Sequence, residues 1–140
     1  MKIAIIYASF NEQIVKNLLK GALQFLKEEK IDKKNIKIIE VPGVFEIPLM
    51  CKKLTKTKKY DGIITLGCII KGQTEHYDML CQTVTDSLMQ IMLEYELPII
   101  FEILMVHDIK YAIARTSLKN WNENKGYTGA RTLLEVIRNK

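Results

Sequence analysis

The sequence has few cysteines and no long apolar run, and these absences exclude several classes of protein. The three cysteines, Cys51, Cys68 and Cys81, show no CxxC spacing, so buried free thiols are expected rather than a disulfide-dependent secreted fold. No window approaches the roughly 18 consecutive apolar residues of a membrane span. The apolar segment at residues 1–7 is too short for a signal peptide. We therefore expect a cytoplasmic protein without a membrane partner.

Motifs for common cofactors and for nucleic acids are also missing. There is no GxGxxG and no GxxxxGK[ST], and no serine or cysteine stands in a nucleophile elbow. His76 and His107 lack the paired spacing with the cysteines that a zinc site requires, so no metal is expected. The formal net charge is +5, but the lysines are scattered and no nucleic-acid-binding motif accompanies them. Nucleic acid is therefore not an expected partner, whereas a positive field suits small anionic substrates.

The apolar residues that are present predict an α/β fold. A length of 140 residues with 48% hydrophobic content fits one domain, residues 1–140. Apolar segments typical of buried parallel strands lie at Lys2–Ala8, Ile36–Val41, Ile63–Leu66 and Ile99–Met105. Helical spacing and caps, with Asn11 and Asp108 as N-caps, predict helices at about Glu12–Lys30, Pro48–Leu54 or a little beyond, His76–Tyr95, Ile109–Ser117 and Gly126–Arg138. This alternation predicts a flavodoxin-like three-layer sandwich with a four-stranded parallel sheet in the order 2-1-3-4.

The loops after the predicted strands should neighbour one another, because the carboxyl ends of parallel strands share one edge of the sheet. These loops are Ser9–Asn11, Pro42–Glu46, Cys68–His76 and Met105–Asp108. The third is the richest in polar groups. Gln73 and Thr74 can present backbone N–H groups near a helix start, and His76 supplies an imidazole, the side-chain type most often used to carry protons. We interpret this loop as an anion site beside a proton carrier.

Each candidate residue also has a simpler interpretation. Phe10 can plug the end of the sheet, and Glu46 can act only as a charge at a helix N-terminus. His76 can be an ordinary residue of a first helical turn, and Arg115 and Lys125 can be surface cations. Taken alone, the residue pattern predicts a ligand-binding α/β domain and no specific reaction.

Several segments match one family pattern in order along nearly the whole chain. They are Phe10-Asn11, Pro42 to Pro48, Gly67 to His76, Pro98 to Phe101, Ala112 with Arg115, and Asn124 to Gly126. With these segments the sequence resembles the 6,7-dimethyl-8-ribityllumazine synthase family. The resemblance implies a transferase of the penultimate step of riboflavin biosynthesis. It would condense 5-amino-6-(D-ribitylamino)uracil with 3,4-dihydroxy-2-butanone 4-phosphate, releasing phosphate and water, with no metal or organic cofactor.

The resemblance also implies roles for individual residues. His76 would move protons and Lys125 would support the charged end of the site, which makes them the expected catalytic residues. Gln73 and Thr74 would bind the phosphate together with Arg115. The pyrimidine and the ribityl chain would be held by Phe10 and Asn11, by Val44, Phe45 and Glu46, by Ile69, Ile70 and Lys71, and by Phe101.

The resemblance further implies an assembly in which neighbouring subunits share each site. Phe101, Arg115 and Lys125 would then come from the chain next to the one that provides His76. The connection Thr116–Asn124 is about two residues longer than the form common in shell-forming members, and no N-terminal extension is present, so a homopentamer is expected rather than a capsid.

The sequence departs from the family pattern at three positions near the site. Glu102, Met105 and Thr128 stand where the family usually has a glycine, a threonine and an acidic residue. Glu102 is also unusual for a buried strand, so it should lie near a sheet edge or have a partner. The alternative functions are a lumazine- or flavin-binding oligomer with weak or no catalysis, and a structural oligomer with a vestigial pocket.

Overall fold

A four-stranded sheet forms the centre of the computed structural model, which describes residues 1–139. All strands are parallel, and their order is β2-β1-β3-β4, as the sequence predicts. The strands are β1 (Ile3–Ala8), β2 (Ile36–Val41), β3 (Gly62–Ile70) and β4 (Ile99–Val106). The two central strands, β1 and β3, are almost wholly buried, which explains why their sequences are continuously apolar.

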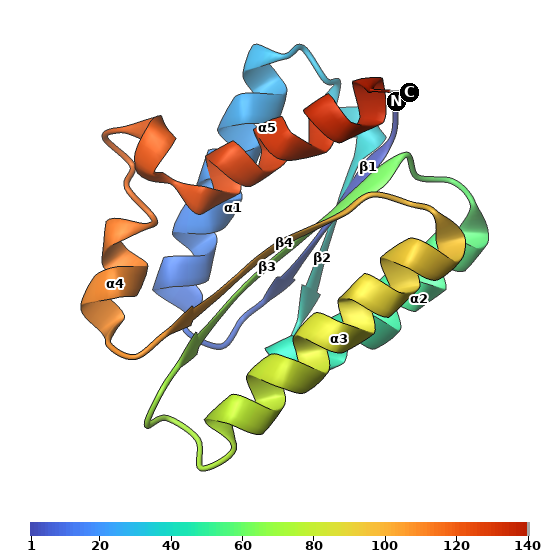
Figure 1. Cartoon of the computed structure of the whole chain (residues 1–140). Coiled ribbons are helices and arrows are strands. Elements are labelled where there is room, and N and C mark those ends of the chain that lie inside the picture. The colour runs from blue at the N-terminus through green and yellow to red at the C-terminus, as the bar shows by residue number, and fades with distance from the viewer. Residues whose placement is uncertain (140) are drawn as a thin grey trace.

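Helices cover both faces of this sheet (Figure 1). The helices α1 (Glu12–Glu28) and α5 (Lys125–Arg138) lie on one face, and α2 (Ile47–Thr57) and α3 (Tyr77–Tyr95) lie on the other. The short helix α4 (Ile109–Ala114) follows β4. Residues 1–139 also contain three 3₁₀ turns, namely η1 (Lys33–Asn35), η2 (Val44–Glu46) and η3 (Trp121–Glu123). The three-layer α/β architecture is therefore confirmed.

Strand β3 is longer than the sequence predicts. We expected the strand to end at Leu66 and the loop to begin at about Cys68, but β3 continues to Ile70 and is buried at all nine positions. The reason is its pairing with β4, which continues from Gly67 opposite Ile103 to Ile70 opposite Val106. The polar loop therefore begins at Lys71, and Ile69 and Ile70 belong to the sheet.

The helix bounds are close to the predicted ones except at the end of α4. Helix α2 begins at Ile47, directly after η2, and runs to Thr57, a little beyond Leu54, as predicted. Helix α4 ends at Ala114 rather than near Ser117, because Thr116 leaves the helix to form an antiparallel bridge with Asn124. The predicted cap of α4 is confirmed, since the Asp108 carboxylate accepts a hydrogen bond from the Lys110 N–H.

The cysteines are free within residues 1–139, as expected. Cys51 and Cys68 are buried, whereas Cys81 is only partly buried, which differs from the expectation of three buried thiols. Among the described residues, no helix combines the length and the apolar character that a membrane crossing requires.

Candidate active site

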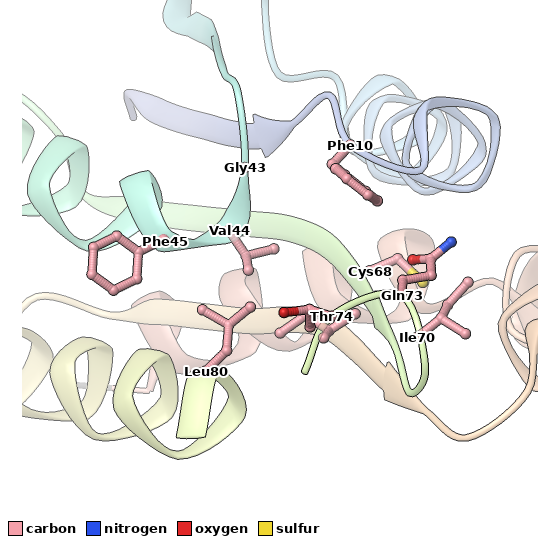
Figure 2. Close-up of a pocket in the computed structure, with 10 residues that line it drawn as sticks. Phe10, Gly43, Val44, Phe45, Cys68, Ile70, Gln73, Thr74 and Leu80 are labelled. Carbon is pink, nitrogen blue, oxygen red and sulfur yellow. The ribbon is translucent and has the colours of Figure 1, made fainter. Parts of the chain in front are cut away.

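A cavity of about 170 Å³ lies at the carboxyl edge of the sheet. Four segments contribute to its walls: the loop after β1, the connection from β2 through η2, the end of β3 with its following loop, and the first turns of α3 (Figure 2). The lining residues are Phe10, Gly43, Val44, Phe45, Cys68, Ile69, Ile70, Gln73, Thr74 and Leu80. Three of the four strand-end loops expected to neighbour one another therefore meet around one cavity.

Asn11 joins two of these loops. Its Nδ2 donates to the Cys68 carbonyl at 2.9 Å and to Gln73 Oε1 at 3.0 Å, and Gln73 Nε2 donates back to Asn11 Oδ1 at 3.1 Å. Asn11 is the N-cap residue of α1, as predicted, but its side chain makes no capping hydrogen bond. Asn11 has a left-handed backbone with φ 60°, which asparagine tolerates better than most residues. Its amide instead fixes Gln73 beside the cavity.

The turn η2 brings backbone groups of Val44 and Phe45 against the end of β3. The Glu46 carboxylate accepts a hydrogen bond from the Gly43 N–H at 3.0 Å, so it stabilises the turn in this chain. The buried Val44 side chain packs close to Gly67, where an added Cβ would lie only 2.7 Å from Val44 Cγ1. Gly67 is therefore required by this close approach of η2 to β3.

The loop from Lys71 to His76 is held as a tight turn. Gly72 has a φ of 97°, and the Gln73 N–H donates to the Ile70 carbonyl at 3.2 Å. The His76 N–H donates to Thr74 Oγ1 at 3.3 Å, which places His76 directly before α3. The His76 residue is exposed and does not line the cavity within the described chain.

Three candidate residues lie on elements that do not contribute to this cavity in residues 1–139. Phe101 packs on the α2 and α3 side of β4. Arg115 ends α4, where its Nη1 donates to the Tyr111 carbonyl at 2.9 Å. Lys125 begins α5, and its N–H donates to the Arg115 carbonyl at 2.8 Å. The structure thus brings Arg115 and Lys125 together at a second location.

Comparison with known proteins decides which family this arrangement represents. A family model described as 6,7-dimethyl-8-ribityllumazine synthase matches residues 1–140. The chain belongs to the 6,7-dimethyl-8-ribityllumazine synthase family. Relatives of that name include one from Limosilactobacillus reuteri, 46% identical over 136 residues, which are 97% of this chain and 87% of the relative. The relative from Leuconostoc mesenteroides is 44% identical over 97% of this chain and 86% of its own length. A third, from Desulfovibrio desulfuricans, is 39% identical over 99% of this chain and 87% of its own length.

For this member of the 6,7-dimethyl-8-ribityllumazine synthase family, sequence reasoning missed Gly43, Cys68 and Leu80 as cavity residues. Leu80 follows the apolar spacing of α3, which indicates a core residue, although its place in the first turn after the loop is a usable signal for the cavity. Cys68 was interpreted as a buried thiol, and burial raises its pKa to about 11. The Cys68 thiol is therefore protonated at neutral pH and contributes apolar surface rather than a nucleophile.

Glu102 has the most strongly shifted pKa among the Asp and Glu side chains of residues 1–139. It lies on the edge strand β4, which confirms the prediction that Glu102 is near a sheet edge or has a partner. Burial raises its pKa to about 7, and the positive charge of Lys125 lowers it by a smaller amount. A carboxyl whose pKa is higher in the folded state binds its proton more tightly there, so the folding stability falls as the pH rises from about 4.3 towards 7.

We expect Glu102→Gln to be more stable than the unmodified chain at pH 8, by up to about 3 kcal/mol, and to show no such advantage at pH 4. Urea unfolding at both pH values measures the difference. The matched control is Glu135→Gln, because Glu135 is exposed on α5 and its replacement should give no pH-dependent gain. An equal stability difference at both pH values would contradict the assignment.

Proposed function

We propose that this chain is a transferase that makes 6,7-dimethyl-8-ribityllumazine in the cytoplasm. It condenses 5-amino-6-(D-ribitylamino)uracil with 3,4-dihydroxy-2-butanone 4-phosphate and releases phosphate and water. The observation that carries this proposal is that three strand-end loops meet around one cavity, in a chain that belongs to this family. No metal or organic cofactor is required by the proposed chemistry.

The pyrimidine substrate is proposed to occupy the cavity in Figure 2. Phe10 is 57% exposed at its wall, which supports a stacking role over that of a plug in the sheet end. The backbone of Ile69, Ile70 and Lys71 lies at the end of β3, where it can pair with the polar edge of the ring. The ribityl hydroxyls extend towards η2, where Val44, Phe45 and Glu46 supply backbone groups and a carboxylate.

The phosphate is proposed to bind at the loop before α3. Gln73 and Thr74 lie at the cavity, and Gln73 is held in place by its hydrogen bonds with Asn11. Arg115 supplies a guanidinium, whose planar fork suits a phosphate. His76 moves protons during imine formation, phosphate loss and ring closure, and Lys125 contributes positive charge beside Arg115.

The proposed site is completed by a second subunit of a homopentamer. A cavity of about 170 Å³ is smaller than the roughly 300–1,000 Å³ of typical ligand pockets. Phe101, Arg115 and Lys125 lie away from it in their own chain, which supports their contribution to a neighbouring cavity. Exposed apolar side chains offer a contact surface for such an assembly, and on α2 and α3 these are Leu49, Met79, Met89 and Leu93.

Mixing both substrates with the purified protein tests the proposal. Lumazine formation, followed by absorbance or fluorescence, should exceed the uncatalysed background in proportion to protein concentration. Binding of lumazine without turnover would instead favour the binding-oligomer alternative. Light scattering should give the mass of a pentamer, and a shell-sized particle would contradict that assembly.

Arg115→Ala is expected to raise the KM for the butanone phosphate by about 10- to 100-fold, because hydrogen bonds between charged groups contribute roughly 1.5–3 kcal/mol. The KM for the pyrimidine should change little. Steady-state kinetics with each substrate varied in turn measure this split. Arg131→Ala removes the same charge from α5, where Arg131 Nη1 contacts Asn122 Oδ1 at 3.3 Å, and serves as the control. An unaltered Arg115→Ala enzyme would refute the phosphate assignment.

A further inference from the structure

Glu102 places a carboxyl group on an apolar face of the sheet, beneath the first turns of α5. Its neighbours in the sheet on this face are Ile100 and Leu104 along β4 and Leu66 on β3, to which Glu102 is paired. The proposed reaction assigns no role to this carboxyl group. Burying an ionised carboxyl group here is costly unless the group is paired with an opposite charge or hydrogen-bonded.

The close approach of α5 to Glu102 depends on a glycine. A Cβ added at Gly129 would lie 2.6 Å from Glu102 Cγ and 3.4 Å from its Cδ, so the Glu102 side chain packs directly against α5 at Gly129. Lys125 is four residues before Gly129 and therefore lies on the same helical face, one turn nearer the N-terminus. Glu102 and Lys125 therefore both lie at this face of α5.

Lys125 remains available to a ligand in this arrangement. It is exposed, and within residues 1–139 no ion pair shorter than 4.0 Å joins it to Glu102. Its charge nevertheless acts on Glu102, since the field of Lys125 lowers the pKa of that carboxyl group against the larger effect of burial.

We propose that Glu102 is a positioning residue that draws the Lys125 ammonium group towards β4, where Arg115 and Lys125 together bind the phosphate of the substrate. This inference rests on the proposed function. The backbone hydrogen bond from the Lys125 N–H to the Arg115 carbonyl, at 2.8 Å, already holds the two residues together. A lysine side chain loses considerable rotamer entropy when it binds, and a carboxylate that limits its rotamers in advance reduces that loss.

A double-mutant cycle tests whether Glu102 acts through Lys125. Glu102→Gln should raise the KM for the butanone phosphate about 3- to 10-fold at pH 8, with a smaller change in kcat. At pH 6 the two enzymes should match, because a carboxyl group with a pKa of about 7 is then mostly neutral in the unmodified protein. In a Lys125→Met background the same Glu102→Gln change should have no further effect at either pH.

A second carboxylate supplied from α5 tests the positioning role by rescue. Thr128 is three residues after Lys125, so Thr128→Glu places a carboxylate near the same ammonium group. When Thr128→Glu is added to Glu102→Gln, the KM for the butanone phosphate at pH 8 should fall most of the way back to the value of the unmodified enzyme. An undiminished Glu102→Gln effect in the Lys125→Met background, or a lower KM in Glu102→Gln alone, would overturn the proposal.

A measurement without turnover separates this proposal from the proposed function. Carbon-13 NMR titration of the Glu102 carboxyl group should give a higher pKa in Lys125→Met than in the unmodified chain. If the chain makes no lumazine but this shift is present, the proposed function fails and the pairing of Glu102 with Lys125 stands. If lumazine forms and the pKa of Glu102 is unchanged by Lys125→Met, the positioning role fails alone.

Discussion

Asn124→Ala is expected to lower the free energy of unfolding by about 3 kcal/mol, because three part-buried polar groups lose a partner and each group left unsatisfied costs roughly 1–3 kcal/mol. Asn124 is fully buried, and its Nδ2 donates to the carbonyls of Asn17 and Ser117, both at 3.0 Å. Its Oδ1 accepts from the Tyr127 N–H at 3.1 Å, which caps α5. Gly21 makes room for this side chain, since an added Cβ would collide with it.

Urea unfolding measures this loss, and Asn120→Ala is the matched control. Asn120 is also an N-cap, but it is exposed and its side chain accepts a single hydrogen bond, from the Asn122 N–H at 3.1 Å. Its replacement should cost about 1 kcal/mol or less. Equal losses in the two variants would show that Asn124 is an ordinary cap and does not join α1, the Ser117 segment and α5.

His76→Ala is expected to lower kcat by roughly 10²-fold and by no more than about 10⁴-fold, the range typical of a general acid–base group. The loss is bounded because the two substrates react readily once they are held together, so their positioning should contribute more to the rate than any one proton carrier. Steady-state kinetics at saturating concentrations of both substrates measure the effect.

Lys71→Ala provides the control for His76→Ala. Lys71 lies in the same loop and is also exposed, but its proposed contact is made by the backbone, so removal of its side chain should leave kcat nearly unchanged. If His76→Ala turned over at the rate of the unmodified enzyme, the proton-carrier role would be refuted. A loss of the same size in Lys71→Ala would indicate that the loop as a whole had moved.

The local patterns in the sequence were sufficient for the strands, their order and most of the helices. Apolar strands without alternation required a sheet covered on both faces, and their alternation with amphipathic helices required parallel strands. The ends of strands were less predictable where pairing with a neighbouring strand decided them. Gly67 to Ile70 resembles the start of a loop in sequence, but β4 offers partners for each of these residues, and the resulting hydrogen bonds extend the strand.

Side-chain roles that depend on distant partners were beyond the sequence. Asn11 is a residue type that commonly caps helices through its side chain. Its side-chain amide instead forms hydrogen bonds with Cys68 and Gln73, which are more than fifty residues away in the sequence. Leu80 has the spacing of a core residue, yet it also lines the cavity. In both cases the local signal was compatible with two structures, and long-range contacts selected one of them.

The sequence by itself determined the fold class, the family and the set of polar groups that gather at the carboxyl edge of the sheet. These follow from periodicity and from motifs, which are local properties of the chain. The tertiary structure decided that Asn11 holds Gln73, that Glu102 lies against α5 at Gly129, and that Arg115 and Lys125 meet away from the cavity in their own chain. Such relations depend on packing between elements far apart in the sequence, because each side chain selects its partner only after the layers have come together.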